Sequence, residues 1–406
     1  MLKTFRNLII IFVILVMLGF SLMVVTYTLP TDNAQKVIVD NPNVINHSYA
    51  TPSYITTHLD FYTDSIILSE VSYYNKNVSL IDNALSVYGI REESDFQSFV
   101  AGNESVIKDY PRYWHGNLVI LKPLFLFFDY DSIKILELFF ELVMVIGIIK
   151  LMSENNLKNY IIPFLFSICL IHPEVIGLSL QFSAMFNIML VSVYILLRFK
   201  EFLFKNNRLY YYFLVVGMAT SFFDLSTYPL VSLGVPLIFY MLMNDNQSNL
   251  KDNILKIILF GLVWSVGFFG MWLSKLIIST IILDKNIIMN AFKQFIFRTS
   301  SVEFTRSDAI LNNILVYKKR AYLVIIGCML IYYVKRAIDS KRFFKKDNFK
   351  SLIPFIIIAL MPFVWYFLVS NHSYIHSFFT YRELVIFFFA IMCMLEYKLN
   401  NENENP

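Results

Sequence analysis

Long apolar runs separated by short polar segments dominate the pattern of this chain. The first run, residues 8–25, follows Lys3 and Arg6. A helix of about 20 apolar residues crosses the ~30 Å hydrocarbon core of a bilayer. No small-residue cleavage site follows the run, so we expect an uncleaved first span with its N-terminus in the cytoplasm.

The next part of the chain, residues 28–116, mixes polar and aromatic residues and lacks long apolar runs. We expect it to be the one large water-exposed segment, on the outer face of the membrane. Residues 116–128 are apolar again, but Lys122 and Pro123 interrupt them. This stretch is too short and too broken to span, so we expect an interfacial helix.

Further apolar runs then follow in quick succession. We place spans at residues 133–149, 160–171, 177–197, 209–222, 228–243, 254–282, 321–334, 352–369 and 384–397. The pattern therefore predicts an all-α, polytopic integral membrane bundle of about ten transmembrane helices. We divide it into a first transmembrane helix (1–27), an extracytoplasmic loop with an interfacial helix (28–131) and a multi-span domain (132–406).

The composition supports a membrane protein. Of 406 residues, 57% are hydrophobic and only 16% are charged, whereas soluble domains carry about 25% charged residues. The three cysteines, Cys169, Cys328 and Cys393, each lie in an apolar run without CxxC spacing. Neither a disulfide framework nor a thiolate metal site follows from them.

The basic residues predict an orientation. They concentrate in the connections 150–158, 198–208, 244–256 and 335–350, the last of which holds Lys335, Arg336, Lys341, Arg342, Lys345, Lys346 and Lys350. The positive-inside rule then puts both termini in the cytoplasm. Lys318, Lys319 and Arg320 fall on the outside in this scheme. Either the seventh span is misplaced, or these residues meet anionic lipid phosphates.

Polar residues gather in the expected outer connections, most densely in residues 371–382. His372 and His376, four residues apart, share one side of a helical turn, and Arg382 follows. Ionisable groups beside membrane spans are costly and usually mark a functional site. The alternative is a solvated loop whose arginine reaches lipid phosphates.

Other outer segments repeat this chemistry. Asp224 precedes Ser226 and Thr227, which suits either a cavity or an ordinary helix cap. Asp60 and Asp64 share a helix face and are either solvated or a carboxylate site.

Basic and aromatic residues add further candidates. Arg112 and His115 flank an aromatic pair that is equally compatible with an interfacial belt. Lys275 lies late in an apolar run and needs a partner or an anionic ligand. The chain has no Walker loop, HExxH or GxSxG motif.

Together, residues 63–68, 112–124, 224–229 and 371–382 resemble the GT-C superfamily of polytopic glycosyltransferases, of the bacterial surface-polysaccharide type. The resemblance covers the layout of most of the chain. It implies inverting transfer of a sugar from a polyprenyl-phosphate donor to a glycan or lipid-linked acceptor on the extracytoplasmic face, with the bilayer and no nucleic acid as partner.

The resemblance also implies roles for single residues. An acid of the first outer loop commonly acts as base, which here is Asp64, with Asp60 or Asp224 as substitutes; the adjacent acidic pair of many members is missing. Candidate phosphate and substrate ligands are Arg112, His115, Lys275, His372, His376, Tyr381 and Arg382. No residue is assigned to a metal, although a divalent cation such as Mg²⁺ or Mn²⁺ stays open.

Two other functions use the same basic outer cavity. A flippase or transporter for a lipid-linked glycan also needs an inner-facing polar route, and few mid-span charges provide one. A polysaccharide polymerase shares the glycan substrate, but its large outer loop usually comes later in the chain than residues 28–116.

Overall fold

The computed structural model describes residues 2–47, 49–55, 57–244, 249–299, 303–340 and 349–400. Within these residues the fold is all-α apart from an isolated bridge between Gly89 and Lys108 and one small antiparallel hairpin, β1 (Ser53–Tyr54) and β2 (Thr57–His58), in which Ser53 lies opposite His58. Lys341, Arg342, Lys345 and Lys346 of the predicted inner connection lie outside the described residues.

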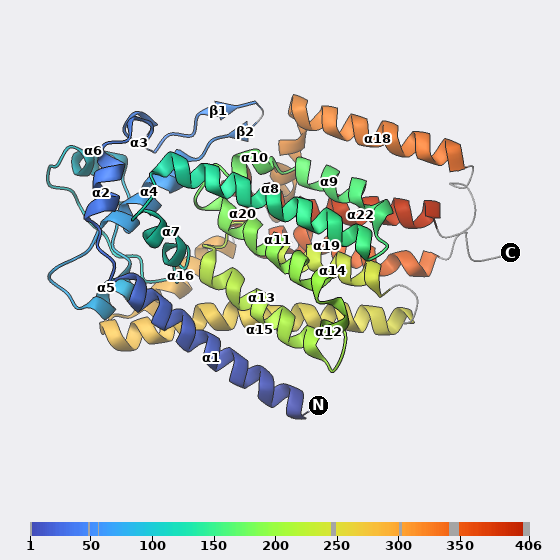
Figure 1. Cartoon of the computed structure of the whole chain (residues 1–406), viewed down its shortest axis with the longest axis horizontal. Helices are drawn as coiled ribbons and strands as arrows, with labels where there is room; N and C mark the ends of the chain where they lie inside the picture. The colour runs from blue at the N-terminus through green and yellow to red at the C-terminus, as the bar shows by residue number, and fades with distance from the viewer. Residues whose placement is uncertain are drawn as a thin grey trace.

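The first part of the chain forms one long helix followed by short ones. The helices are α1 (Leu2–Thr26), α2 (Asp32–Val39), α3 (Pro42–His47), α4 (Phe61–Ser72), α5 (Leu80–Ser86), α6 (Glu93–Val100) and α7 (Leu118–Leu124). Figure 1 shows α2 to α7 and the hairpin gathered at one end of the helix bundle. The expected interfacial helix is α7, at whose end Lys122 precedes Pro123.

The rest of the chain builds the bundle. Its helices are α8 (Tyr130–Glu154), α9 (Ile161–Cys169), α10 (Pro173–Ile176), α11 (Phe182–Arg198), α12 (Lys200–Leu203), α13 (Arg208–Phe223), α14 (Val231–Met243), α15 (Leu250–Leu283), α16 (Ile287–Thr299), α17 (Arg306–Leu315), α18 (Arg320–Ser340), α19 (Ile353–Leu368), α20 (Ser370–Ile375), α21 (Ser377–Thr380) and α22 (Val385–Asn400). Short 3₁₀ turns are η1 (Lys158–Tyr160), η2 (Val316–Lys318), η3 (Phe349–Leu352) and η4 (Tyr381–Leu384).

Within the described residues, five helical segments are long and apolar enough to cross a membrane: Leu2–Thr26, Leu250–Leu283, Arg320–Asp339, Lys350–Leu368 and Ser377–Leu399. These five segments indicate a multi-pass membrane protein. Their number is smaller than the ten spans expected from the sequence. The difference arises in the middle of the chain, where α8 is long but carries Lys134, Glu137, Glu141 and Lys150, and where the other apolar runs form shorter helices. At 1.5 Å per residue, the 13 residues of α14 reach only about 20 Å.

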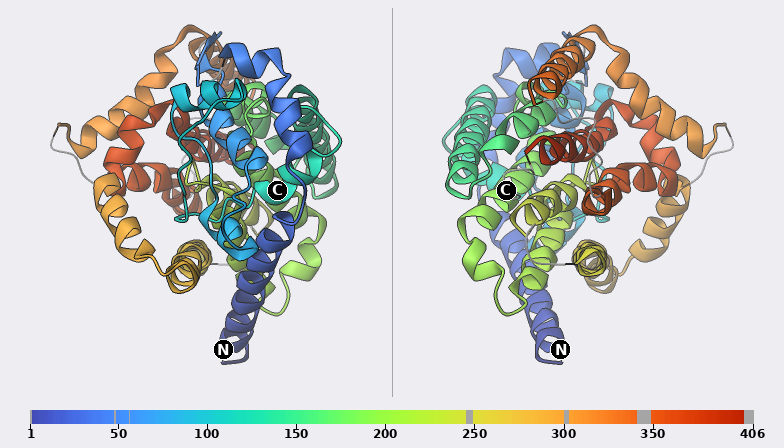
Figure 2. Two further views of the ribbon diagram at one scale, coloured as in Figure 1. Left: turned by 90° about the vertical axis from the view of Figure 1, so that its left-hand side faces the viewer. Right: turned by 90° about the vertical axis from the view of Figure 1, so that its right-hand side faces the viewer.

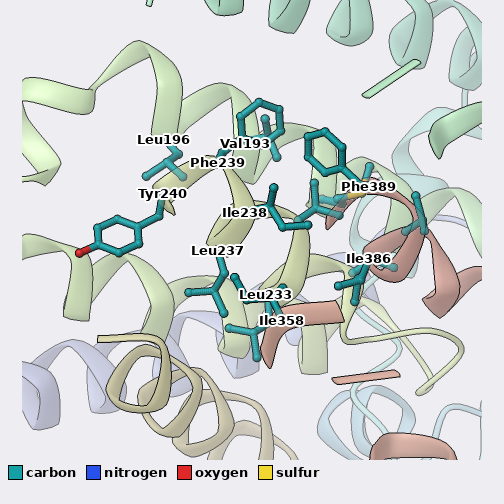
Figure 3. Close-up of a cluster of buried hydrophobic side chains, with 14 of the residues drawn as sticks. Val193, Leu196, Leu233, Leu237, Ile238, Phe239, Tyr240, Ile358, Ile386 and Phe389 are labelled. Atoms are coloured by element: carbon teal, nitrogen blue, oxygen red, sulfur yellow. The ribbon is translucent and has the colours of Figure 1, made fainter. Parts of the chain in front are cut away.

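The core explains why these shorter helices are so apolar. Figure 3 shows Leu237, Ile238 and Phe239 of α14 surrounded by side chains of α11, α19 and α22, including Val193, Ile358 and Phe389. Nearly every side chain of α14 is buried. Its sequence is hydrophobic all round because it is enclosed by other helices, and this is the same signal that a lipid-facing helix gives.

Glycines let α13 and α15 pack backbone to backbone. A Cβ on Gly217 would lie 2.2 Å from the Trp264 carbonyl oxygen, and one on Gly267 would lie 2.4 Å from the Leu214 carbonyl oxygen. Small residues at helix crossings permit this close approach in membrane bundles. The contact sets the relative position of the loop after α13 and the segment that follows α15.

Replacing Gly217 with valine should therefore destabilise the bundle by about 2 kcal/mol or more, because overpacking forces the two backbones apart. Thermal unfolding of the detergent-purified protein, followed by tryptophan fluorescence, measures the effect. Gly261→Ala is the matched control, since a Cβ at Gly261 meets nothing within 4 Å. Equal melting temperatures for both variants would contradict the proposed close contact.

Candidate functional site

The polar stretch 371–382 is a buried connection between α19 and α22. It forms α20, α21 and η4 in succession, and Arg382 is only 1% exposed. Asn371 Nδ2 donates to the Phe297 carbonyl oxygen at 2.6 Å, and Thr380 Oγ1 donates to Asn313 Oδ1 at 2.7 Å. The stretch is therefore held by α16 and α17, and the alternative of a solvated loop does not fit its burial.

Beside this stretch lies a cavity of about 370 Å³, which we call the arginine cavity. Its walls come from α15, α16, α19, α20 and the loop after α13, and Figure 2 shows α16 and α17 standing out at one side of the bundle. The polar and tryptophan side chains of its lining are Arg112, Ser221, Asp224, Ser226, Trp272, Gln294, Arg298, Thr299, Arg306, Trp365 and His372.

The three arginines of this cavity are held by aromatic rings. The guanidinium carbon of Arg112 lies 4.8 Å from the centre of the Tyr110 ring, and Arg112 Nη1 donates to Asn290 Oδ1 at 2.8 Å. Arg298 lies over Tyr113 at 5.6 Å, and Arg306 lies over a phenylalanine ring at 4.5 Å. Across the described part of the chain, no carboxylate forms an ion pair with any of the three. The cavity therefore carries an excess of positive charge suited to an anion.

His372 also lines the arginine cavity, and one of its two ring nitrogens has no hydrogen-bond partner among the described residues. Its Nε2 lies 2.9 Å from the Ser226 carbonyl oxygen, so Nε2 carries the proton and donates it. Nδ1 is then a hydrogen-bond acceptor, and it is buried without a partner among the described residues. Burial, together with the positive charge of Arg298, holds the pKa of His372 well below its usual range. The imidazole is neutral at pH 7.

Asp224 lines the cavity and also organises a turn. It accepts hydrogen bonds from the Thr227 backbone N–H at 2.8 Å and from Thr227 Oγ1 at 2.6 Å, while Gln181 Nε2 lies 3.4 Å away. Burial raises the pKa of Asp224 to about 6, although the bonds from Thr227 oppose the shift. The two interpretations of this residue, cap and cavity group, therefore apply together.

Gly116 brings Arg112 to the cavity. Its backbone N–H donates to the Phe222 carbonyl oxygen at 2.8 Å, and a Cβ at this position would lie 2.3 Å from the Phe222 ring. The segment before α7 therefore docks against the end of α13, two residues from Asp224.

A second cavity of about 470 Å³, which we call the hairpin cavity, lies on the other side of the same stretch. It is lined by Thr51, Thr57, His58, Leu59, Asp60, Phe182, Asn312, Leu315, Val316, Lys319, Ser377, Phe378 and Tyr381. Residues 371–382 thus contribute His372 to one cavity and Ser377, Phe378 and Tyr381 to the other.

Asp60 and Asp64, the two acids that share a face of α4, lie in different surroundings. Asp60 caps α4 by accepting from the Thr63 backbone N–H at 3.1 Å, and it lines the hairpin cavity. Asp64 accepts from the Tyr130 hydroxyl at 2.6 Å and from the Leu180 backbone N–H at 2.9 Å. Burial raises the pKa of Asp64 to about 7 against the opposing charge of Lys134. Both oxygens of Asp64 are engaged, and it lines neither cavity.

The other predicted site residues lie away from the arginine cavity. His115 pairs with Glu70 at 3.0 Å. Lys275 Nζ donates to the Leu85 carbonyl oxygen at 2.8 Å. His376 stacks on a phenylalanine ring with centroids 5.1 Å apart. Arg382 lies over the ring of Phe182 at 4.6 Å, and its Nε donates to a backbone carbonyl at 3.3 Å.

No group of three or more His, Cys, Asp or Glu side chains in the described ranges is placed to hold a metal ion. Of the site residues predicted from the sequence, Arg112, Asp224 and His372 line the arginine cavity. Arg298 and Arg306 line it as well but were not predicted. Their position in the sequence could have identified them, because both arginines lie in the expected outer connection between the spans 254–282 and 321–334.

Comparison with known proteins gives no further assignment: no protein-family model, no curated protein and no solved structure matches the chain.

Ionisation of Asp224 should weaken anion binding in the arginine cavity. Raising the pH through about 6 deprotonates this carboxyl and adds a negative charge to the cavity. Sulfate affinity should therefore fall about fivefold between pH 5 and pH 7.5, the size of a ~1 kcal/mol charge interaction. Sulfate keeps its charge in this range, and fluorescence of Trp272 and Trp365 reports its binding.

Asp224→Asn is the control for this titration, because it removes the ionisable group and keeps the size of the side chain. Its sulfate affinity should not change over the same range. An identical pH dependence in the wild-type protein and in this variant would exclude Asp224 as the titrating group.

Proposed function

We propose that this protein is a membrane glycosyltransferase of the GT-C type, which transfers a sugar from a polyprenyl-phosphate-linked donor to a glycan or lipid-linked acceptor on the extracytoplasmic face. The observation that carries the proposal is the arginine cavity. Three cations without carboxylate partners surround a neutral histidine and a carboxyl group, at the end of an apolar helix bundle.

The orientation of the bundle supports this proposal. Figure 1 shows α12 and the C-terminal end of α18 away from the end that holds α2 to α7. These regions carry basic residues, among them Arg198, Lys200 and Lys335. By the positive-inside rule they face the cytoplasm, so the cavities open toward the outside. Together with the five candidate spans, α8 and the shorter helices α9, α11, α13 and α14 give a bundle of about ten membrane-embedded helices.

The basic cluster 318–320 also fits this orientation. Lys319 lines the hairpin cavity together with His58 and Asp60, both of which belong to the segment that we expect on the outer face. Its ammonium group therefore belongs to a polar cavity at the outer end, and the seventh span needs no change of orientation.

The chemistry follows from the charges. The guanidinium groups bind the donor phosphate and stabilise the charge that develops on it as the bond to the sugar breaks. The acceptor hydroxyl oxygen attacks the anomeric carbon and its proton passes to Asp224 or to Nδ1 of His372. The electron pair of the broken C–O bond stays on the phosphate oxygen. Attack from the face opposite the phosphate inverts the anomeric centre.

The hairpin cavity suits the distal sugars of the acceptor glycan, while its attacking hydroxyl lies with the donor in the arginine cavity. This cavity offers hydroxyl, amide and carboxylate groups with three aromatic rings and a single cation, Lys319. Such a lining suits a neutral polyhydroxyl compound better than a phosphate, because aromatic faces and neutral hydrogen-bonding groups dominate it.

Mass spectrometry of surface polysaccharide and lipid-linked intermediates from a deletion strain tests the function. We expect a polymer of normal length that lacks one side-chain sugar, with the polyprenyl-phosphate sugar accumulating. Complementation with Arg298→Gln should fail, since it removes a cation from the phosphate site. Complete repeat units that accumulate outside would indicate a polymerase instead, and units that accumulate inside would indicate a flippase.

Filling the hairpin cavity should block the acceptor. Ser377→Trp places an indole in this cavity, so a complemented strain should lose more than nine-tenths of the transferred sugar. Ser377→Ala is the matched control, since it removes the hydrogen bond from Asn312 Nδ2 at 3.0 Å without filling space. Normal glycan from the tryptophan variant would show that the acceptor binds elsewhere.

A further inference from the structure

The arginine cavity holds more anion-binding capacity than one phosphate group requires. Its three arginines come from separate parts of the chain: Arg112 precedes α7, Arg298 lies at the end of α16 and Arg306 begins α17. Each rests against an aromatic ring, which fixes the guanidinium plane while leaving donors available. The three cations therefore surround the cavity from different directions.

Two tryptophans also line the same cavity. The Nε1 atoms of Trp272, from α15, and Trp365, from α19, are buried and have no hydrogen-bond partner in the described part of the protein. A buried N–H group without an acceptor is unfavourable. An indole nitrogen donates only, so a small rotation of either ring would let it donate to an oxygen of a ligand in the cavity.

Charge balance separates two kinds of donor. A lipid monophosphate sugar has one negative charge and two non-bridging oxygens, and it leaves as a group of charge −2. A lipid diphosphate sugar has two charges and four non-bridging oxygens, and it leaves with charge −3. If Asp224 takes the acceptor proton and becomes neutral, the three guanidinium charges match the diphosphate product and exceed the monophosphate product by one.

We propose that the arginine cavity binds a diphosphate, so that the donor is a lipid diphosphate-linked saccharide. This inference rests on the proposed function and replaces its monophosphate donor by a diphosphate donor, so that the lipid diphosphate-linked saccharide is the species that accumulates in the deletion strain. In the transfer step the acceptor oxygen forms a bond to the anomeric carbon, and the bond from that carbon to the diphosphate breaks. The electron pair stays on the diphosphate oxygen, and the acceptor proton moves to Asp224.

Two short lipid probes test the inference with the purified full-length protein in nanodiscs. Geranyl diphosphate and geranyl phosphate share the same apolar tail, and fluorescence of Trp272 and Trp365 reports binding of either. We expect geranyl diphosphate to bind at least tenfold more tightly. Citrate, which carries three negative charges without phosphate, controls for charge alone and should also bind at least tenfold more weakly than geranyl diphosphate.

One variant asks whether the third cation provides this preference. Arg306→Gln should lower the affinity for geranyl diphosphate about tenfold and change that for geranyl phosphate less than threefold. Retained binding of geranyl phosphate shows that the variant is folded. Arg320→Gln is the matched control, because Arg320 is exposed at the start of α18 and lines neither cavity.

The outcomes separate the inference from the function on which it rests. Equal affinities for the two geranyl probes, or citrate binding as tight as geranyl diphosphate, would overturn the diphosphate assignment and leave a phosphate-binding transferase in place. Binding of neither probe by the wild-type protein would remove the donor site itself, and with it the proposed function.

Discussion

The close packing of α13 against α15 determines the geometry of the arginine cavity. Gly217 and Gly267 allow the two backbones to meet, and the Trp264 carbonyl oxygen occupies the space where a side chain of α13 would otherwise stand. Beyond this contact, α13 ends at Asp224 and α15 continues to Trp272 and to α16 with Arg298. The Asp224 carboxylate and the Arg298 guanidinium therefore reach the same cavity from α13 and from the segment after α15. Gly217 and Gly267 set the distance between these two helices.

The cavity combines arginines, whose charge is fixed, with His372 and Asp224, whose charge depends on pH. The arginines keep their charge at any physiological pH. His372 is held neutral by burial and by Arg298, and Asp224 has a pKa raised to about 6. The groups that can accept a proton thus lie beside groups that cannot lose one. This is the arrangement that acid–base chemistry on an anionic substrate requires.

The sequence predicts an all-α protein with membrane-spanning helices, but it overestimates the number of helices long enough to span. The runs that became α1, α15, α18 and α22 combine length with apolar character, and both properties can be read from the chain. α14 has the apolar character without the length, because it is enclosed by protein on all sides. Periodicity alone does not distinguish a helix that faces lipid from one that faces other helices. The site shows the same limit: Asp64 and Arg382 are as polar as Asp224 and Arg298, but their tertiary partners bury them away from both cavities.

Residues 371–382 form part of the wall of both cavities, and this shared wall has a thermodynamic consequence. A ligand that shifts His372 also shifts the stretch that carries Ser377 and Tyr381, since α20 and α21 follow each other without a linker. If a ligand in one cavity changes the binding free energy of a ligand in the other, the second ligand changes the binding free energy of the first by the same amount. Such coupling makes simultaneous occupancy of the two cavities more or less favourable than independent binding of each ligand, without imposing an order of loading.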